Sequence, residues 1–274
     1  MAQPDEYFLG HGLAEQQRFQ QQARELGDES RWLFDRIGLA AGSRAVEIGC
    51  GPQGCLELLS RQVGPEGSVV GIEMSDHAVE LVRRFLAEHR LVNVEVRQGN
   101  GKATGLPRES FDLATARLVL VNVPEPERII QEMVAFVRPG GTVALHEADW
   151  LGHLCDPPLP AWDRLFEALA AYSKANGIDL FVGRRTPRML RAAGLTDVQV
   201  NPLFHVYPSG HSRRPIFLQF VQNLRDRILA QGLISEAEFT DSVAALERHL
   251  EDPGTLVVSH LFFQAWGRKP MRLS

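Results

Sequence analysis

The stretch that decides the fold runs from Arg44 to Gly54 and reads R-A-V-E-I-G-C-G-P-Q-G. Its first part, Arg44–Ile48, is short, apolar and rich in β-branched residues, which is typical of a buried parallel strand. Directly after the glycines, Cys55–Val63 carries apolar residues at helical spacing. The stretch therefore predicts a strand, a tight glycine turn and a helix, the unit that places a ligand at the carboxyl end of a parallel sheet.

Glu47 decides between two classes of ligand for this turn. Gly49, Gly51 and Gly54 also fit G-x-G-x-x-G, the fingerprint of dinucleotide binding. A pyrophosphate would meet the like charge of Glu47 in a partly desolvated site, which is unfavourable. A cationic ligand without phosphate suits the position better, and S-adenosylmethionine, with its sulfonium and ammonium groups, is such a ligand.

The same residues carry a family resemblance. V-E-I-G-C-G-P-Q-G resembles motif I of the class I S-adenosylmethionine-dependent methyltransferases, of the small-molecule type found in ubiquinone and menaquinone biosynthesis. One departure is Gln53, where this family often has glycine. The resemblance implies S-adenosylmethionine as cofactor and assigns cofactor binding to Glu47, Gly49 and Gly51.

A second buried strand, Ser68–Glu73, ends in a carboxylate. Glu73 follows Gly51 by about 20 residues, where the acidic residue of such folds accepts hydrogen bonds from the ribose hydroxyls. The resemblance assigns the same role to Glu73 and places Met74 against the adenine, although a plain core methionine remains an alternative. Ser75 is expected to cap a helix over His77–Glu88.

A third strand, Val92–Gln98, leads into G-N-G-K. Relatives usually have an aspartate after the first of these glycines, and Asn100 is the best match here. An amide can accept from the adenine amino group and donate to a ring nitrogen. We therefore expect Asn100 to read the adenine, with Lys102 as the alternative, and Gly101 to contribute a backbone N–H.

Two further motifs are expected at the methionine end of the cofactor. Phe111–Ala116 is a fourth strand, and F-D-L-x-x-x-R-L-V-L resembles the motif that follows this strand in the family, so that Arg117 would pair with the cofactor carboxylate. The alternative for Arg117 is a solvated residue at the sheet edge. Near the start, Y-F-L-G-H-G resembles the opening of a bacterial subgroup and implies that Tyr7 and His11 approach the cofactor; residue type alone favours anchoring of the N-terminus.

The fifth strand carries the candidate catalytic residues. A helix over Pro124–Val137 ends in R-P-G-G, which is characteristic of these methyltransferases, and strand Thr142–Glu147 follows. His146 and Glu147 stand at its carboxyl end, where the catalytic residues of open α/β sheets lie. They form either an acid/base device or a satisfied polar cluster.

The remainder is expected to complete the sheet and to cover the site. Strand Val198–Tyr207 precedes an insertion, 208–253, with two helices over Pro215–Ala230 and Ser235–Leu250, and Thr255–Gly267 is the last strand. The first helix is so apolar that it must be covered. It is expected to wall the substrate pocket, or else to pack in a homodimer.

Composition narrows the class of protein. The 274 residues contain 44% hydrophobic and 23% charged residues, as is usual for a soluble enzyme, and the net charge of −5 argues against nucleic acid as a partner. The three cysteines form no metal-binding pair and indicate a reducing cytosol, and neither a signal peptide nor a membrane span is expected.

Together these features predict an α/β fold with a doubly wound, seven-stranded mixed sheet whose last strand is antiparallel. The expected organisation is N-terminal cap helices in 1–40, a cofactor-binding core in 41–150, and the rest of the sheet with its helical cap in 151–274. By resemblance the function is methyl transfer to a small molecule by in-line displacement, with no metal. Alternatives are a non-methylating reaction such as a cyclisation, with the cofactor structural, a regulatory protein with a degenerate site and, more distantly, an NAD-dependent oxidoreductase.

Overall fold

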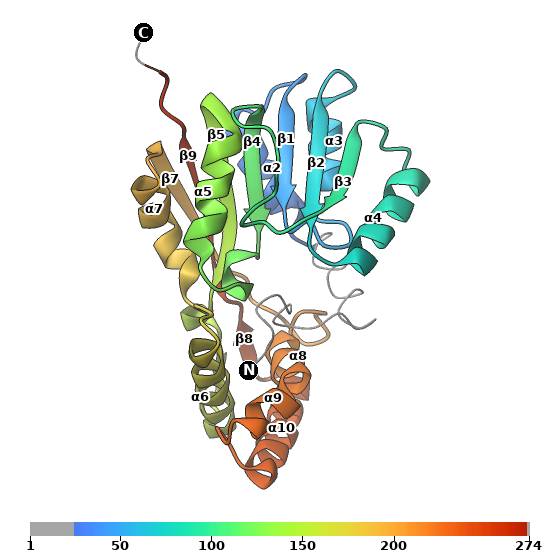
Figure 1. Cartoon of the computed structure of the whole chain (residues 1–274). Helices are drawn as coiled ribbons and strands as arrows, with labels where there is room; N and C mark the ends of the chain where they lie inside the picture. The colour runs from blue at the N-terminus through green and yellow to red at the C-terminus, as the bar shows by residue number, and fades with distance from the viewer. Residues whose placement is uncertain (1–24, 273–274) are drawn as a thin grey trace.

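The central strand of the molecule is the one that precedes the glycine turn. The computed structural model describes residues 25–272, and in it β1 (Arg44–Ile48) lies between β2 (Ser68–Glu73) and β4 (Phe111–Arg117). The strand order is β3-β2-β1-β4-β5-β9-β7 (Figure 1). The remaining strands are β3 (Val94–Gln98), β5 (Val137–Asp149), β7 (Thr196–Leu203) and β9 (Leu261–Arg268).

Strands β1 to β5 are parallel to one another, whereas β9 runs antiparallel to both β5 and β7. The predicted mixed sheet with an antiparallel last strand is therefore confirmed. The chain extends the sheet from β1 toward β3 and then returns to the other side of β1 with β4. This reversal makes the carboxyl ends of β1 and β4 a topological switch point, the position at which open α/β sheets bind their ligands.

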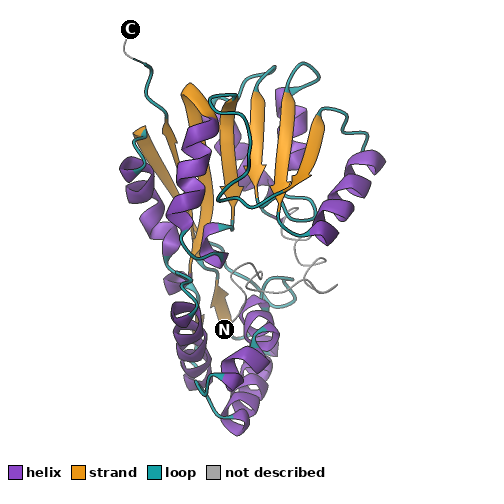
Figure 2. Ribbon diagram, in the orientation of Figure 1, coloured by secondary structure: helices purple, strands orange, loops and turns teal. Residues whose placement is uncertain are grey.

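Helices cover both faces of the sheet (Figure 2). Residues that alternate along a strand face opposite sides, so Ala45 packs in one apolar cluster and Val46 in the other. The first cluster includes residues of α2 (Gly27–Ile37), α3 (Leu56–Val63) and α4 (Asp76–Glu88). The second includes residues of α5 (Pro126–Phe136) and α7 (Val182–Ala192).

A separate group of helices lies beyond the carboxyl ends of the strands, at the bottom of Figure 1, and we call it the cap. It consists of α6 (Pro160–Ala175), α8 (Ile216–Asn223), α9 (Arg225–Ala230) and α10 (Glu236–Glu251). A small sheet of β6 (Leu154–Asp156) and β8 (Leu256–Val258) accompanies them. The predicted helix over Pro215–Ala230 does lie at this end of the sheet.

The cap corrects two predictions. The single helix expected over Pro215–Ala230 is wrong, because the chain turns at Leu224 and forms α8 and α9. The single last strand over Thr255–Gly267 is also wrong, because its first part pairs with β6 and only its second part joins the large sheet. Between the two parts, Ser259 donates its backbone N–H to the carbonyl oxygen of His205 (2.8 Å).

The R-P-G-G segment was expected to separate helix α5 from strand five. In the structure β5 begins at Val137, immediately after α5, and the segment belongs to the strand. The pairing of β5 with β4 is irregular between Phe111 and Leu113, and Gly140 has a positive φ of 79°. The glycines therefore shape an irregular strand start and do not form a separate turn.

One buried arginine, Arg214, connects several segments of the cap through hydrogen bonds. The guanidinium of Arg214 is 3% exposed and donates hydrogen bonds to four carbonyl oxygens, at 2.6 to 2.9 Å. These carbonyls belong to Tyr207, Leu250, Asp252 and Thr255. The arginine thus joins the segment before α8 to the end of α10 and the start of β8.

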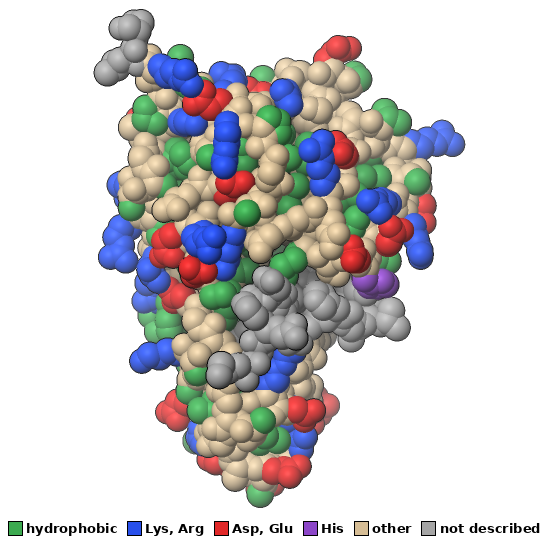
Figure 3. Space-filling view, in the orientation of Figure 1, with side chains coloured by type: hydrophobic (Ala, Val, Ile, Leu, Met, Phe, Trp, Pro, Cys, Tyr) green, Lys and Arg blue, Asp and Glu red, His purple; other side chains and the backbone are tan. Residues whose placement is uncertain are grey.

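On the face seen in Figure 3, Lys and Arg side chains are interspersed with Asp and Glu. Within residues 25–272, no helix is both long enough and apolar enough to cross a membrane.

Candidate functional site

The glycine turn after β1 is closely packed. Gly49 has a φ of 66°, and a Cβ added to it would stand 2.6 Å from Cγ2 of Val119 in the loop after β4. Gly54 has a φ of 53°, and its added Cβ would stand 2.6 Å from Oε2 of Glu47. Both positions therefore require glycine, for backbone conformation and for space.

Glu47 supports this turn from within. Its carboxylate is 1% exposed, and both of its oxygens accept the backbone N–H of Cys55, at 3.0 and 2.8 Å. Burial raises the pKa of Glu47, while the positive charge of Arg117 and the Cys55 hydrogen bond oppose that shift. The structure thus places Glu47 as a brace for the turn, and its predicted contact with a cationic cofactor stays a prediction.

Glu73 connects the turn to the end of β2. Its Oε2 accepts the backbone N–H of Gly51 at 2.9 Å, and its Oε1 accepts that of Ser75 at 2.9 Å. A carboxylate has about four lone-pair sites, so two remain for other donors. Glu73, the residue predicted to bind the ribose, therefore lies beside the glycine turn at one edge of the sheet.

The predicted adenine residues lie on the turn after β3. The side-chain oxygen of Asn100 accepts the backbone N–H of Lys102 at 2.9 Å. A Cβ added to Gly101 would stand 2.7 Å from Cγ2 of Ile48, so the turn packs closely on β1. The carbonyl of Met74 accepts the Gln98 side chain at 3.4 Å. Adenine contacts by Met74, Asn100 and Gly101 stay predictions.

Arg117 links the turn to the N-terminal helix α2. Its guanidinium donates to Oγ of Ser30 at 2.9 Å and to the carbonyl oxygen of Gly54 at 3.1 Å. These bonds exclude the alternative of a solvated residue at the sheet edge. Two of the five N–H donors of the guanidinium are used in this way.

Glu147 holds the loop that follows β4. The carboxylate is fully buried and accepts the backbone N–H groups of Val119, Leu120 and Val121 at 2.9 to 3.3 Å. Burial raises its pKa to about 8, although the three N–H groups lower it. Leu118, at the start of the loop, has a positive φ of 56°, a strained conformation that the surrounding bonds maintain.

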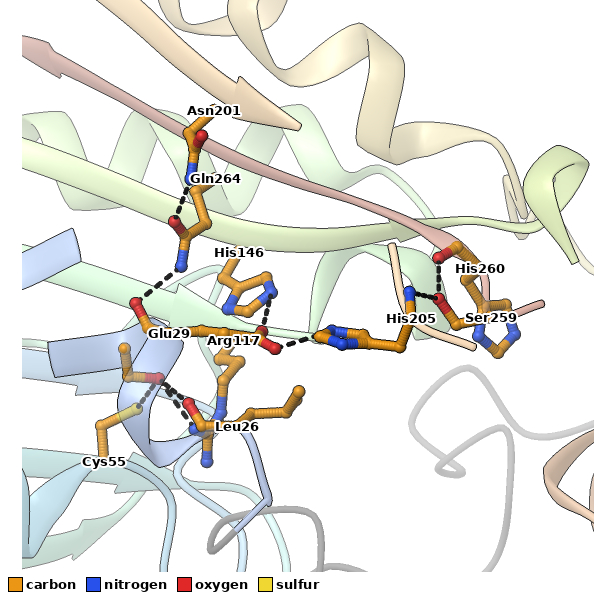
Figure 4. A network of polar contacts seen from close by, with 11 residues as sticks. Leu26, Glu29, Cys55, Arg117, His146, Asn201, His205, Ser259, His260 and Gln264 are labelled. Atoms are coloured by element: carbon orange, nitrogen blue, oxygen red, sulfur yellow. Dashed lines mark hydrogen bonds and ion pairs between the residues drawn. The ribbon is translucent and has the colours of Figure 1, made fainter. Parts of the chain in front are cut away.

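His146 lies beside a carboxylate from α2 (Figure 4). Its Nε2 is 3.5 Å from Oε2 of Glu29, too far for a well-formed hydrogen bond, and the other oxygen of Glu29 lies 2.7 Å from Nε2 of His205. Burial lowers the pKa of His146 to about 3, and the positive charges of Arg117 and Arg213 act in the same direction. His146 is therefore neutral near pH 7 and a weak proton acceptor.

The bonds around Glu29 continue in two directions. Gln264 donates to the Glu29 carbonyl at 2.8 Å and accepts from Asn201 at 3.0 Å. The backbone N–H of His205 donates to Ser259 Oγ at 2.8 Å, which donates to the His260 carbonyl at 2.7 Å. Because Ser30 and Glu29 are adjacent, the start of α2 touches both the cofactor turn and this chain of bonds, as Figure 4 shows.

A small cavity of about 30 Å³ lies between this network and the cap. Leu118 and Val121 of the loop after β4 line it, together with Trp150 at the end of β5. Helix α8 contributes Ile216 and Phe220 to this lining. That the cavity receives the substrate, as predicted for the apolar helix, stays a prediction.

Several residues of this region carried no signal in the sequence analysis, namely Glu29, Ser30, His205 and Arg213. The available hint for Ser30 was its place on the same face of α2 as the apolar residues Leu33 and Phe34. Tyr7 and His11 lie outside the described residues. Within 25–272, no group of three or more His, Cys, Asp or Glu side chains could hold a metal ion.

The low pKa of His146 makes a prediction about stability. Folded His146 stays neutral down to about pH 3, whereas in the unfolded chain it binds a proton below about pH 6.5. Between these values the unfolded state binds more protons, so His146 makes the free energy of unfolding fall as the pH is lowered. We expect His146→Gln to show a shallower fall than the wild type in urea unfolding from neutrality to about pH 5.

His77 provides the matched control, because it is an exposed histidine on α4. His77→Gln should follow the wild type at each pH. A His146→Gln variant with the wild-type slope would contradict a pKa far below the usual range.

Comparison with known proteins gives the family. Residues 39–190, more than half of the chain, match the family model described as a methyltransferase domain. Demethylmenaquinone methyltransferase of Listeria monocytogenes is 30% identical over 131 residues, which cover 48% of this chain and 53% of that protein. The chain thus spans about half the length of the first curated relatives that it matches.

Two solved structures share the fold. One is phosphoethanolamine N-methyltransferase 2 of Haemonchus contortus in complex with S-adenosyl-L-methionine, with a TM-score of 0.57, 15% identity, and coverage of 89% of this chain and 53% of that one. The other is the [4+2]-cyclase SpnF, with a TM-score of 0.55, 22% identity, and coverage of 92% and 83%. At these identities the likeness shows the fold alone.

The resemblance found in V-E-I-G-C-G-P-Q-G is therefore confirmed, and with it S-adenosylmethionine as the cofactor that this family uses. The sheet order, the glycine turn after β1 and the family match agree. The chain belongs to the methyltransferase domain family.

Proposed function

We propose that this protein transfers a methyl group from S-adenosylmethionine to a small molecule that has an apolar part. The observation that carries the proposal is the hydrogen bond from the Gly51 N–H to Glu73, which joins the glycine turn to the carboxylate at the end of β2. When bound, the cofactor supplies an electrophilic methyl group on a sulfonium. In-line attack on it needs a correctly placed acceptor more than it needs acid–base chemistry.

The residues of the chain divide into two groups in this proposal. Glu73 binds the ribose, Asn100, Gly101 and Met74 surround the adenine, and Gly49 and Gly51 allow close approach of the backbone. Arg117 binds the cofactor carboxylate with the donors that Ser30 and Gly54 leave available. Tyr7 and His11 would complete the methionine end.

The acceptor would occupy the side of the cap. Trp150, Ile216 and Phe220 supply an apolar wall there, which supports an acceptor with an apolar part. The name of the Listeria relative makes demethylmenaquinone one acceptor to test first.

We assign His146 and Glu147 to positioning. Near neutral pH His146 is a weak base because burial holds its pKa near 3, and Glu147 is engaged by three N–H groups. Of the two interpretations that the sequence leaves open for this pair, an acid/base device or a satisfied polar cluster, these features support a role other than general base. The acceptor would then have to supply its own acidity or nucleophilicity.

Glu73 provides the test of cofactor binding. Glu73→Ala removes the ribose ligand and should weaken binding of S-adenosylhomocysteine by about ten- to a hundredfold, or about 1.5–3 kcal/mol, in calorimetry. Glu80→Ala, an exposed carboxylate on the neighbouring helix α4, should leave the affinity unchanged. NAD should not bind to either variant or to the wild type.

Unchanged affinity in Glu73→Ala would refute the role of this residue. Incubation with methyl-labelled cofactor and candidate acceptors then tests the reaction itself. Label in a product, with S-adenosylhomocysteine formed in equal amount, supports methyl transfer. A converted substrate without label would favour the alternative in which the cofactor is structural.

A further inference from the structure

One amide side chain stands in the wall of the small cavity between the polar network and the cap. Asn122 lines this cavity together with Val121, Trp150 and Phe220. It belongs to the short 3-10 helix η1 (Leu120–Asn122) after β4, and only 9% of it is exposed. The residue is therefore part of the cavity wall and not of the outer surface.

One hydrogen bond sets the orientation of the Asn122 amide. Nδ2 of Asn122 donates to the carbonyl oxygen of Leu118 at 2.8 Å, which fixes the nitrogen toward the loop. The side-chain oxygen Oδ1 accepts no hydrogen bond from the residues in 25–272, and it is not one of the buried atoms that lack a partner. This oxygen is therefore available to a donor from a bound molecule.

The loop that carries Asn122 is braced before any molecule binds. The backbone N–H of Asn122 donates to the carbonyl oxygen of Val119 at 3.0 Å, and the Glu147 carboxylate accepts three further N–H groups of this loop. Val119 also packs against Gly49 of the glycine turn. Because the same loop contacts this turn and lines the cavity, a group held by Oδ1 would lie on the acceptor side of the proposed cofactor site.

The other polar side chains of the lining have interactions of their own. Arg213 and His260 each contact further groups of the protein. Arg213 pairs with Glu25 at 3.7 Å, and His260 packs against Trp150 with ring centres 4.1 Å apart. The remaining lining is aliphatic or aromatic. A molecule in the cavity therefore meets a mostly apolar wall in which the Asn122 oxygen is open to a donor.

We propose that the methyl acceptor carries a hydroxyl or N–H group on its apolar part, and that Oδ1 of Asn122 accepts a hydrogen bond from this group. This assignment rests on the proposed methyl transfer and names its substrate class. The cavity of about 30 Å³ has room for a hydroxyl or amino group, and because it is partly open, the apolar part can extend beyond it. An amide oxygen takes up no proton near neutral pH, so the bonded group keeps its proton and Asn122 is a positioning residue.

Phenol and toluene test this assignment, because they differ only by a hydroxyl in place of a methyl group of similar size. Their affinities are measured by NMR titration in the presence of S-adenosylhomocysteine, and the preference for phenol is compared between variants. Asn122→Leu removes the oxygen and should lower this preference by about tenfold, because the hydroxyl then enters without a partner. Asn122→Asp keeps an oxygen but loses the donor to Leu118, and it should keep the preference within about threefold or raise it.

Asn176 provides the matched control. Its Nδ2 donates to the carbonyl oxygen of Tyr172, four residues earlier, at 2.8 Å, as Nδ2 of Asn122 does to that of Leu118. Asn176 follows the end of α6 and does not line the cavity. Asn176→Leu should therefore leave the preference for phenol unchanged.

An equal fall in Asn122→Leu and Asn122→Asp would overturn the proposal, because both variants lose the bond to Leu118 and only one loses the oxygen. An unchanged preference in Asn122→Leu, or a wild type that does not bind phenol, would overturn it as well. The affinity for S-adenosylhomocysteine, measured on the same samples, separates these outcomes from a failure of the proposed function, which loss of cofactor binding in the wild type would show. If Asn122→Leu fails to fold, Asn122→Ala takes its place with the same expected result.

Discussion

Replacing Glu147 by alanine is expected to lower the free energy of unfolding by about 3 kcal/mol or more. The change leaves the N–H groups of Val119, Leu120 and Val121 without their acceptor; the last two are buried, and each buried loss costs about 1–3 kcal/mol. It also releases the loop whose Leu118 has a strained conformation and whose Val119 packs against Gly49. Urea unfolding measures the first effect and cofactor calorimetry the second, which should appear as weaker binding.

Glu147→Gln separates hydrogen bonding from charge. Glutamine keeps one acceptor oxygen, so the loss of stability should be less than half that of the alanine variant. The pKa of about 8 in the folded state lies above the usual value of 4.5, so the folded state binds more protons between these values. This group therefore makes the wild type less stable as the pH rises through that range, and Glu147→Gln should lack this part of the slope.

Glu88→Ala, an exposed carboxylate at the end of α4, is the control and should change stability little. If Glu147→Ala unfolds at the same urea concentration as the control, the bonds of Glu147 do not support the loop.

Replacing Arg214 by methionine is expected to reduce the proposed methyl transfer by at least about a hundredfold, while S-adenosylhomocysteine binds nearly as tightly as before. The change removes four hydrogen bonds from a charged donor, each worth about 1.5–3 kcal/mol, and leaves buried carbonyls unpaired. These bonds join parts of the cap, whereas Glu73 and the glycine turn belong to the sheet. The substitution should therefore loosen the cap and disrupt the proposed acceptor cavity, while the cofactor site stays intact.

Single-turnover transfer and calorimetry on one preparation test this separation. Arg214→Lys should be intermediate, because an ammonium reaches fewer of the four carbonyls. Arg225→Met removes an exposed arginine of α9 and is the control for loss of a positive charge from the cap. A parallel collapse of cofactor affinity and transfer in Arg214→Met would mean that the cap and the sheet fold as one unit.

The sheet was predictable because its signals are local. The apolar run of β1 ends just before Gly49, and that of β2 ends at Glu73. The residues that start or stop an element lie within a few positions of it in the sequence; Ser75, for example, caps α4 with its side chain. These apolar runs alone predict where β1 and β2 end, and therefore also predict the positions of the glycine turn and Glu73.

The acceptor side could not be predicted in the same way. Its residues come together only through tertiary packing. Glu29 contacts His205, which is far from it in the sequence, and Arg214 donates hydrogen bonds to carbonyl groups of distant segments. The break at Ser259 depends on pairing of β8 with β6, a strand too short to give a periodic pattern. For His146 the sequence leaves open an acid/base device or a polar cluster, because position at the end of a strand does not show how far burial lowers the pKa of the side chain.

The contacts of α2 bear on how acceptor choice can be exchanged between members of this family. The family match begins at residue 39 and leaves α2 outside it. A chimera that places residues 150–258 of this chain on the sheet of a relative would carry His205 and Arg213 along. It would leave behind Glu29 and Glu25, the carboxylates that face them. The chimera should therefore keep these ion pairs only when residues 25–37 are transferred together with the cap, as one transplantable module.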